Sequence, residues 1–367
     1  YRPIALLPNF AKIFESFTSG IIYSHVCRDI IPEQHGFVKG RSTMTNLCEF
    51  TQYVSNALDR RLQVDTIYTD LSKAFDTVHH CILLYKLKSF GISDQLLLLL
   101  KSVIVGRQQY VEFGGHKSSI FNVGSGVAQG SNLGPLLFII FFNDAVSSLK
   151  CRTFIYADDL KIANVIENYY DCLILQQDVE YFLLWCTRNK LILNNSKCKA
   201  MCFTRKKRSI KFYCNISGKV LELCCQFRDL GVIMDQKLTF SSHIEYITNA
   251  ALKTLGFIIR ATHDFTDIYC IKLLFYTLVR SKMEYCSVIW KPYQQIYINL
   301  LENVLRKFCK YSYYKMFGSY PVRHCEQRAL LSIVNEYSML SRSNLSCLIF
   351  FQKIGLKSLD STSLAVG

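Results

Sequence analysis

Two adjacent aspartates, Asp158 and Asp159, lie in the stretch TFIYADDLKIA, between two runs of apolar and β-branched residues. Neighbouring carboxylates repel each other, and removing both from water is costly unless a positive charge lies beside them. The flanking runs predict the two strands of a hairpin that is anchored in the core and carries the acids at its tip. A third carboxylate, Asp70, ends the stretch VDTIYTD, whose β-branched and aromatic residues predict another strand.

If these three acids meet at one sheet edge, they form a cluster of hard oxygen ligands of the kind that binds Mg2+. Two such ions can activate an attacking hydroxyl and stabilise a leaving pyrophosphate. The spacing leaves a second interpretation open, which is a solvated acidic turn. The apolar residues on both sides of the pair favour the functional interpretation, because a core hairpin has no structural use for two charges.

The elements that must position these acids follow from the periodicity of the rest of the chain. Helices are predicted at 9–24, 42–62, 81–87, 95–105, 135–146 and 169–189, and again from 242 almost to the end. Strands are predicted at 64–70, on both sides of the acid pair, within 108–126 and in short segments between 191 and 216. This order predicts an α+β architecture with a helical C-terminal unit.

The composition limits the partners and the compartment. The 367 residues carry a formal charge of +15, which favours a polyanionic partner, with nucleic acid ahead of an anionic membrane. The apolar runs 96–105 and 136–142 are too short to span a bilayer, so no membrane partner is expected. The 16 cysteines lack zinc-finger spacing and follow no signal peptide, which indicates reduced thiols and an intracellular protein. The chain opens on Tyr1, which suggests an excerpt of a longer protein.

Several blocks of the sequence resemble the reverse transcriptase domain of non-LTR (LINE-type, jockey-like) retrotransposons. In chain order, the first blocks are YRPIALLPNFAKIFE, EQHGFVKGRSTMTNL, TDLSKAFDTVHHCIL and SGVAQGSNLGPLLFIIFFNDA. The YADD hairpin comes next. After the hairpin come NKLILNNSKCKAMCFTRK, the primer-grip block FRDLGVIMDQKLTFSSHI and LVRSKMEYCSVIWKPY. The blocks follow in the family's order and cover the chain up to about residue 320. The chain departs from the pattern at Ala128, where Pro is common, and at Asn132, where an apolar residue is common.

The resemblance implies a right-hand polymerase fold and RNA-templated DNA synthesis. It places the fingers at 1–62, the palm at 63–84, an insertion of fingers and palm at 85–124, the palm with the primer grip at 125–240, and a helical thumb with a C-terminal extension at 241–367. The implied partners are an RNA template, a DNA primer or target and a dNTP, with an endonuclease domain upstream in the full-length protein. The implied location is the nucleus and the cytoplasm.

The same resemblance implies a role for each acid. Asp70 and Asp158 are the expected ligands of two Mg2+ ions, with Mn2+ as an alternative, and the Leu71 carbonyl is a further ligand. Asp159 is the expected auxiliary acid. Lys197 is expected to protonate the departing pyrophosphate, although Lys199 lies two residues away on the same predicted strand. Asp76, six residues after Asp70, is expected to be a helix cap or a surface charge.

The nucleotide pocket is expected from three further blocks. Phe75 lies where these polymerases place the bulky residue that collides with a ribose 2′-OH, although its spacing also fits a core aromatic. Gln129 and Gly130 match the Gln-Gly pair that lines the pocket, where glycine lets the backbone approach the substrate. The candidate triphosphate partners, each of which is also readable as a surface charge, are Arg2, Lys12 and Arg41.

Nucleic-acid contacts are expected from a basic run and from the primer-grip block. Every charged residue between Trp185 and Phe212 is Lys or Arg, and a run of this kind either grips a phosphate backbone or forms a solvated face. The expected nucleic-acid-binding residues are Arg205, Lys206, Lys207, Arg208, Leu230 and Gly231.

Two other functions stay open, a domesticated retroelement fragment that binds nucleic acid without polymerising it and a Mg2+-dependent nuclease or phosphatase.

Overall fold

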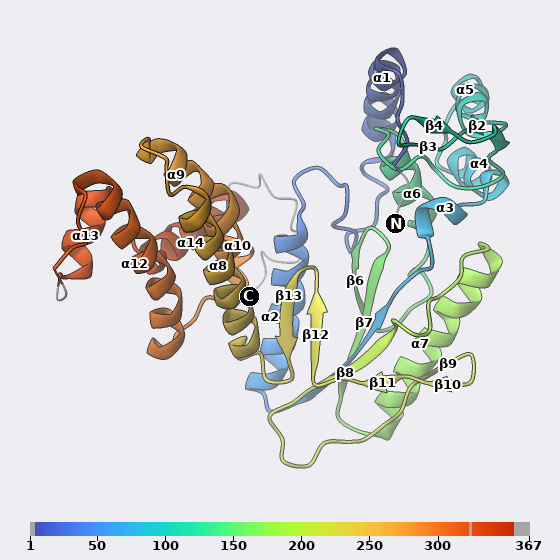
Figure 1. Ribbon diagram of the computed structural model, residues 1–367. Helices are drawn as coiled ribbons and strands as arrows, with labels where there is room; N and C mark the ends of the chain where they lie inside the picture. Colours follow the sequence, from blue (N-terminus) through green and yellow to red (C-terminus); the bar gives the residue numbers. More distant parts are fainter. Residues whose placement is uncertain (1–3, 323–324, 356–367) are drawn as a thin grey trace. The chain divides into compact units, whose positions relative to one another are not determined.

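The computed structural model describes residues 4–322 and 325–355, which form two compact units (Figure 1). Unit 1 comprises Tyr1–Asn46 and Tyr53–Cys225, and unit 2 comprises Leu47–Gln52 and Gln226–Gly367. Unit 1 contains the acids singled out above. No helix in the described part of the chain is long and apolar enough to cross a membrane.

Unit 1 is built on a five-stranded sheet with the strand order β11-β8-β1-β7-β6. The pairs are antiparallel except for β11 and β8, which are parallel. The central strand β1 is buried along most of its length, as expected for a strand covered on both faces. The strands are β1 (Gln63–Thr69), β6 (Arg152–Tyr156), β7 (Asp159–Ile166), β8 (Lys199–Phe203) and β11 (Glu222–Leu223).

The register brings the predicted acids to one edge of this sheet. Thr69, the last residue of β1, pairs with Leu160 of β7, so Asp70 leaves the sheet beside the start of β7. Tyr156 pairs with Asp159 across the turn between β6 and β7. The structure therefore confirms that the strand ending at Asp70 and the acidic hairpin share an edge.

Helices pack around this sheet, and their ends follow local signals. The first turn of α2 is closed by a capping box, in which the Ser42 side chain accepts from Thr45 N and the Thr45 side chain accepts from Ser42 N. Helix α6 is apolar on all sides, which is typical of a fully buried helix. The helices are α1 (Asn9–Val26), α2 (Thr43–Asp59), α3 (Ala74–Thr77), α4 (His80–Ser89), α5 (Asp94–Ile104), α6 (Gly134–Phe142) and α7 (Tyr169–Arg188).

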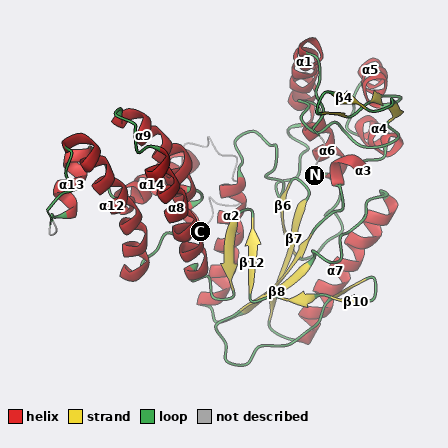
Figure 2. Cartoon of the chain, in the orientation of Figure 1, coloured by secondary structure: helices red, strands yellow, loops and turns green. Residues whose placement is uncertain are grey.

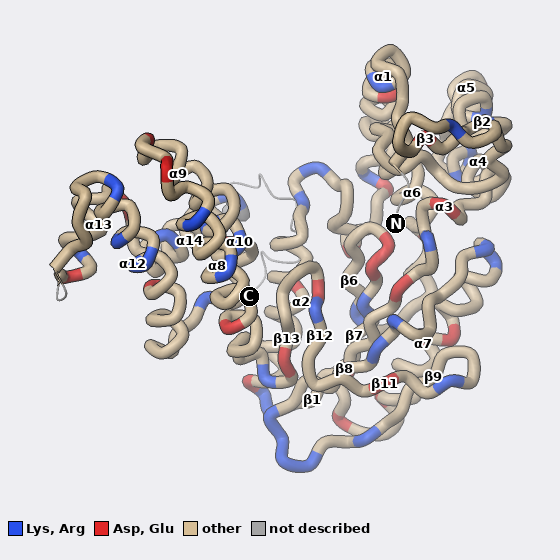
Figure 3. The backbone as a smooth tube through the Cα atoms, viewed as in Figure 1, with Lys and Arg blue, Asp and Glu red and all other residues tan. Residues whose placement is uncertain are grey.

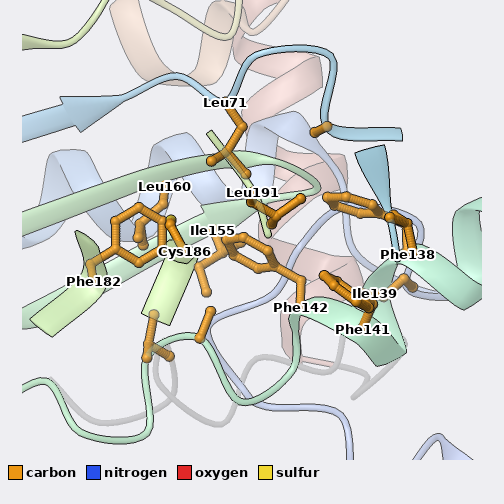
Figure 4. Close-up of a cluster of buried hydrophobic side chains, with 14 of the residues drawn as sticks. Leu71, Phe138, Ile139, Phe141, Phe142, Ile155, Leu160, Phe182, Cys186 and Leu191 are labelled. Carbon is orange, nitrogen blue, oxygen red and sulfur yellow. The ribbon is translucent and has the colours of Figure 1, made fainter. Parts of the chain in front are cut away.

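The core of unit 1 lies directly behind the acidic edge. Figure 4 shows the aromatic side chains of α6 in one buried cluster with Leu71, Ile155 and Leu160, which come from the strand ends that carry the acids. Phe138 and Phe142 are both fully buried. This packing fixes the strand ends, because a close-packed interior allows little displacement of any member.

Two exposed pairs of short strands follow α5, and a third pair follows β8. Gly114 and Gly115, both with positive φ, form the turn between β3 and β4, which lies within the region 108–126 where strands are predicted. The strands are β2 (Gln108–Gln109), β3 (Glu112–Phe113), β4 (His116–Lys117), β5 (Phe121–Asn122), β9 (Asn215–Ile216) and β10 (Lys219–Val220).

The described residues of unit 2 are helical apart from one hairpin, which begins the segment that starts at Gln226 (Figure 2). The division between the units falls at 225/226, so the β12–β13 hairpin belongs to the same unit as the helices that follow it. The first of these helices starts at Ser241, next to the predicted start at 242. The elements are β12 (Gln226–Asp229), β13 (Val232–Asp235), α8 (Ser241–Ala261), α9 (Ile268–Phe275), the π-helix η1 (Tyr276–Arg280), α10 (Ser281–Glu284), α11 (Ser287–Trp290), α12 (Gln295–Phe317), α13 (Gln327–Val334) and α14 (Met339–Gly355). The mixed sheet followed by helices confirms the predicted α+β class.

Candidate active site

A cleft of about 750 Å³ opens at the acidic edge of the sheet in unit 1. Segments that are far apart in sequence contribute to its wall, which is why no single motif could define it. Its lining residues are Phe37, Asp70, Leu71, Ser72, Lys73, Ala74, Phe75, Asp76, Ala128, Gln129, Gly130, Ser131, Pro135, Asp158, Asn194 and Lys197. Asp70, Asp158, Phe75, Gln129, Gly130 and Lys197, all singled out from the sequence, thus line one cavity.

Asp70 is held by its backbone, while its carboxylate reaches the cleft. Its carbonyl accepts from Asn194 N at 2.8 Å, and its N–H donates to Cys198 Sγ at 3.4 Å. Its Oδ2 atom is buried and has no hydrogen-bond partner among the described residues. Lys197 Nζ forms an ion pair with the same oxygen at 3.4 Å. A buried carboxylate oxygen without a hydrogen bond is costly, which favours a cation as its partner.

The buried thiol of Cys198 supports the backbone of Asp70, because its sulfur accepts the hydrogen bond from Asp70 N. Burial raises the pKa of this thiol.

The two acids of the hairpin take different positions. Ala157 and Asp158 form the two-residue turn between β6 and β7, and Ala157 has a φ of 56°. Asp158 is half-buried and lines the cleft. Asp159 begins β7, is exposed and does not contribute to the lining. The turn thus separates the two neighbouring side chains that the sequence expectation places together.

The donor set fits a hard divalent cation such as Mg2+. No group of three or more His, Cys, Asp or Glu side chains in residues 4–322 and 325–355 forms a ready-made metal cage. Mg2+ does not require one, because it is commonly held by one or two carboxylates together with substrate phosphates. Asp70 and Asp158 supply two carboxylates to the cleft. Leu71 and Leu193 form an antiparallel β-bridge, whose hydrogen bonds are made by Asp70 O and Ser72 N. The Leu71 carbonyl takes no part in these bonds.

Phe75 lies in the cleft wall, on a stack of aromatic rings. Its ring is 4.5 Å from that of Phe138 with an interplanar angle of 14°, and 6.1 Å from that of Phe37 in an edge-on arrangement. The side chain is half-buried and lines the cavity. The ring thus packs against the core and also lines the cavity, so the core interpretation stays open and the role in sugar selection stays a prediction.

Asp76 has a role that its position in the sequence did not reveal. Its Oδ1 atom accepts from Gln129 Nε2 at 3.4 Å, and its backbone carbonyl accepts from Ser125 Oγ at 2.9 Å. Gly126 has a φ of 88°, and a Cβ there would lie 2.7 Å from Asp76 O. Asp76 therefore holds the loop that carries Gln129, and it lines the cleft instead of facing solvent as a surface charge.

Asn132, which departs from the family pattern, ties the same loop to α1. Its N–H donates to Glu15 Oε2 at 3.0 Å, and its Nδ2 donates to Lys12 O at 3.1 Å. Gly130 has a φ of 91°, and Ala5 N donates to Gln129 O at 2.8 Å. The loop is thus fixed on two sides by contacts that only the tertiary structure creates.

Two of the expected triphosphate partners, Lys12 and Arg41, do not line the cleft. The Arg41 guanidinium donates to the carbonyls of Ile31, Pro32 and Gln34, and the residue does not line the cavity. Lys12 is exposed on α1 and also lies outside the lining. Arg2 lies outside the described residues.

Two cations do line the cleft, and the sequence had suggested only Lys197. Lys73 is exposed in the cleft wall, next to the start of α3. The N–H groups of Lys73, Ala74 and Phe75 donate no hydrogen bond among the described residues. Lys199, the alternative to Lys197, forms an ion pair with Glu222, so the structure separates the two lysines.

The basic run lies at the other end of the sheet. Phe203, the last residue of β8, pairs with Val64 near the start of β1. The chain then enters an exposed loop that carries Arg205, Lys206, Lys207 and Arg208, visible as a continuous basic stretch in Figure 3. Because β1 runs for seven residues from this end towards Asp70, the loop is about 20 Å from the acidic edge.

Leu230 and Gly231 form the turn of the β12–β13 hairpin in unit 2. Both have positive φ, at 43° and 92°, as a two-residue turn of this kind requires. Tyr285 Oη donates to Leu230 O at 2.8 Å, and a Cβ at Gly231 would lie 3.1 Å from the Tyr285 ring. The turn is therefore rigidly held within its unit.

This sheet, with paired acids on a hairpin opposite a strand-end aspartate, defines a nucleic-acid polymerase of the right-hand type. Comparison with known proteins agrees, because the model of the family described as reverse transcriptase (RNA-dependent DNA polymerase) matches residues 1–259. The chain belongs to this family, and the predicted fold is confirmed.

Two similar proteins are named as polymerases of mobile elements, and a similar solved structure is a telomerase. The chain is 34% identical over 257 residues to the RNA-directed DNA polymerase from mobile element jockey of Drosophila funebris, covering 66% of this chain and 28% of that protein. It is 34% identical over 253 residues to the probable RNA-directed DNA polymerase from transposon X-element of Drosophila melanogaster, again covering 66% and 28%. A telomerase structure from Candida albicans is 13% identical, with a TM-score of 0.43, over 88% of this chain and 54% of that one. The chain thus spans less than a third of the length of these curated relatives.

Proposed function

We propose that this chain is an RNA-directed DNA polymerase, which transfers a nucleotide from a dNTP to the 3′-OH of a primer paired with an RNA template. The observation that supports this most strongly is the cleft itself. Asp70 and Asp158, which are 88 positions apart in the sequence, line one cavity with the Gln-Gly loop and Phe75. In a chain of this family, that arrangement matches the needs of nucleotidyl transfer.

Asp70 and Asp158, with the Leu71 carbonyl, would hold Mg2+ or Mn2+. When bound, the ions would supply activation of the attacking hydroxyl and neutralise charge on the leaving pyrophosphate. The buried Oδ2 of Asp70 accepts no hydrogen bond among the described residues and is balanced by the Lys197 ammonium group at 3.4 Å, so a bound ion would share this oxygen with Lys197. Asp159, exposed on β7, would act as an auxiliary charge beside the turn.

The basic side of the cleft would bind the triphosphate. Lys73 lines the wall and is exposed, so its ammonium group would face the phosphate oxygens. Lys197 would contact the departing pyrophosphate and donate a proton to it from Nζ. Phosphate oxygens accept hydrogen bonds readily, so ammonium groups suit this part of the nucleotide.

The sugar and base would lie against Phe75 and the Gln129–Gly130 loop. The Phe75 ring is supported by Phe138 behind it and would collide with a ribose 2′-OH. Asp76 orients the Gln129 amide, and Gly130 allows close approach of the backbone. These contacts would select a deoxynucleotide and place its α-phosphate near the two acids.

Template and primer would be bound by other surfaces. The exposed basic loop 205–208 would bind a phosphate backbone away from the chemical step. The Leu230–Gly231 turn is the proposed primer grip. The full-length protein would carry an endonuclease domain upstream and act in the nucleus and the cytoplasm, as the resemblance to non-LTR retrotransposons implies.

Primer extension on poly(rA)–oligo(dT) with Mg2+ and dTTP tests the proposed function. The 367-residue chain should extend the primer, and its Asp158→Ala variant should not. Extension by both proteins would show that the metal assignment is wrong. Failure of both with duplex binding retained would favour the alternative, a domesticated fragment that binds nucleic acid without polymerising it. Cleavage of the substrate without dTTP would instead indicate a nuclease.

A further inference from the structure

A buried glutamine holds the turn that carries Asp158. Gln34 lies in the loop between α1 and α2 and is only 1% exposed. Its Oε1 atom accepts from Ala157 N at 2.8 Å and from Gly36 N at 2.7 Å. Its Nε2 donates to Ala157 O at 3.2 Å. One side-chain amide thus binds both backbone polar groups of the residue that precedes Asp158.

The backbone next to this amide is paired with the hairpin as well. His35 N donates to Ile155 O at 2.8 Å, and Ile155 N donates to Glu33 O at 3.0 Å. These bonds form a parallel bridge between Gln34 and Ile155. The loop therefore acts as a short additional strand at the free side of β6, and Gln34 extends from it towards the turn.

Gly36 allows this close approach. A Cβ at Gly36 would lie 2.2 Å from Ala157 N and 2.9 Å from Ala157 Cα, which no side chain can tolerate. Both contacts are with backbone atoms, so a flexible side chain cannot move aside to relieve them. The Gln34–His35–Gly36 segment is therefore shaped to fit against Ala157.

The turn needs such support because its conformation is unfavourable. Ala157 has a φ of 56°, in the left-handed region that residues other than glycine seldom occupy. Without the Gln34 amide, both polar groups of Ala157 would lose a buried partner, and the turn would relax towards a commoner conformation. In a two-residue turn, any change at Ala157 moves the neighbouring Asp158 carboxylate.

We infer that Gln34 is a positioning residue for the chemical step, which acts through Ala157 to place the Asp158 carboxylate in the cleft. Gly36 serves the same purpose by admitting the contact. A displacement of about 1 Å in a reacting group can lower a rate about 10²-fold, so loss of the amide should reduce the turnover number far more than the affinity for the nucleotide. The inference rests on the proposed polymerase activity for its kinetic part alone.

The chain offers a matched control in a second buried glutamine. Gln63 is also 1% exposed, and its amide binds Ile210 in the same way, with Oε1 accepting from Ile210 N and Nε2 donating to Ile210 O, both at 2.9 Å. It lies at the start of β1, at the end of the sheet opposite Asp70. Gln34→Met and Gln63→Met therefore remove the same kind of amide clamp, but only the first one faces the turn.

The test compares these two variants with the parent chain. Gln34→Met should lower kcat about 10²-fold while KM for dTTP stays within about threefold, and Gln63→Met should keep kcat within about threefold at a similar loss in Tm. The dissociation constant of Mn2+, measured by electron paramagnetic resonance, should rise about 10-fold in Gln34→Met and stay unchanged in Gln63→Met. The Asp158→Asn variant removes a proposed metal ligand itself, so it shows how far the dissociation constant of Mn2+ rises when a ligand is lost.

Equal effects of the two methionine variants on kcat and on Mn2+ binding would overturn the inference and leave Gln34 a structural residue. If Gln34→Met does not fold, Gln34→Glu replaces it, because the carboxylate still accepts from both N–H groups but no longer donates to Ala157 O. This variant should bind Mn2+ more weakly than the parent, and parental affinity would overturn the inference. If the parent extends no primer, the proposed function fails, while Mn2+ binding still decides the role of Gln34.

Discussion

Lys197 Nζ lies 3.4 Å from Asp70 Oδ2, so a cation of the chain itself contacts the carboxylate that is proposed to bind metal. The contact is built by the backbone, because Asn194 N donates to Asp70 O and Leu193 bridges Leu71. Lys197 is therefore held at the metal side of the cleft, where a departing pyrophosphate would also lie.

Replacing Lys197 by Met should lower kcat about 10²-fold, because the leaving group no longer has a proton donor. The Mg2+ concentration for half-maximal rate should fall, because an ammonium group no longer competes for Asp70. Single-turnover extension over a range of Mg2+ concentrations measures both effects. Lys199→Met is the control, since Lys199 is paired with Glu222, and equal rates for the two variants would contradict the assignment.

Asp158→Asn and Asp159→Asn should differ in spite of their adjacency. Asp158 lines the cleft, whereas Asp159 is exposed on β7. The first change should reduce incorporation by about 10³-fold or more, because loss of a metal ligand forfeits several kcal/mol of transition-state stabilisation. The second should cost about 10-fold. The rates of dTTP incorporation by the two variants test this prediction, and fluorescence anisotropy checks that both still bind the duplex. A larger loss of rate in Asp159→Asn than in Asp158→Asn would refute it.

Phe75→Val should admit ribonucleotides. The smaller side chain leaves space for a 2′-OH, and loss of the stack on Phe138 should reduce the free energy of unfolding by about 1–3 kcal/mol. The ratio of kcat/KM for dTTP to that for UTP measures the selectivity. Phe142→Leu is the control, because Phe142 stacks on the same Phe138 at 5.8 Å without reaching the cleft. Unchanged selectivity in Phe75→Val would assign the ring to the core alone.

Asp76→Ala should weaken nucleotide binding. It removes the acceptor that orients the Gln129 amide, so KM for dTTP should rise about 10-fold, with a smaller change in kcat. Steady-state kinetics on the same primer–template separate the two constants. Asp94→Ala, which removes an exposed acid on α5, should leave KM at the parental value. A KM that does not move in Asp76→Ala would return this acid to a surface role.

Neutralising residues 205–208 to glutamine should weaken template–primer binding without slowing chemistry at saturation, because the loop lies at the far end of the sheet. For every phosphate group that the loop no longer neutralises, the slope of log affinity against log salt should become shallower by about 0.7–0.9. The control variant removes the same charge from four other exposed lysines, Lys88, Lys101, Lys150 and Lys219. Equal slopes in the two variants would identify the loop as a solvated face.

Local signals in the sequence determined which strands and helices carry the candidate site residues and where these elements begin and end. The β-branched run before Asp70 and the apolar flanks of Asp158 encode strands, and Ser42 encodes the start of α2. These features depend on backbone propensity, side-chain periodicity and capping, which act within a few residues. For that reason the acidic edge of the sheet was predictable before the structure was known.

Contacts between distant segments were decided only by the tertiary structure. Gln34 and Ala157 are separated by 123 positions and Asp76 and Gln129 by 53, and nothing in their local sequence marks them as partners. For Arg41 and the basic loop, the sequence showed the positive charge but not the groups that lie beside it in the fold. A sequence pattern specifies which face of an element is apolar, whereas packing of the whole core determines which polar side chains meet across it.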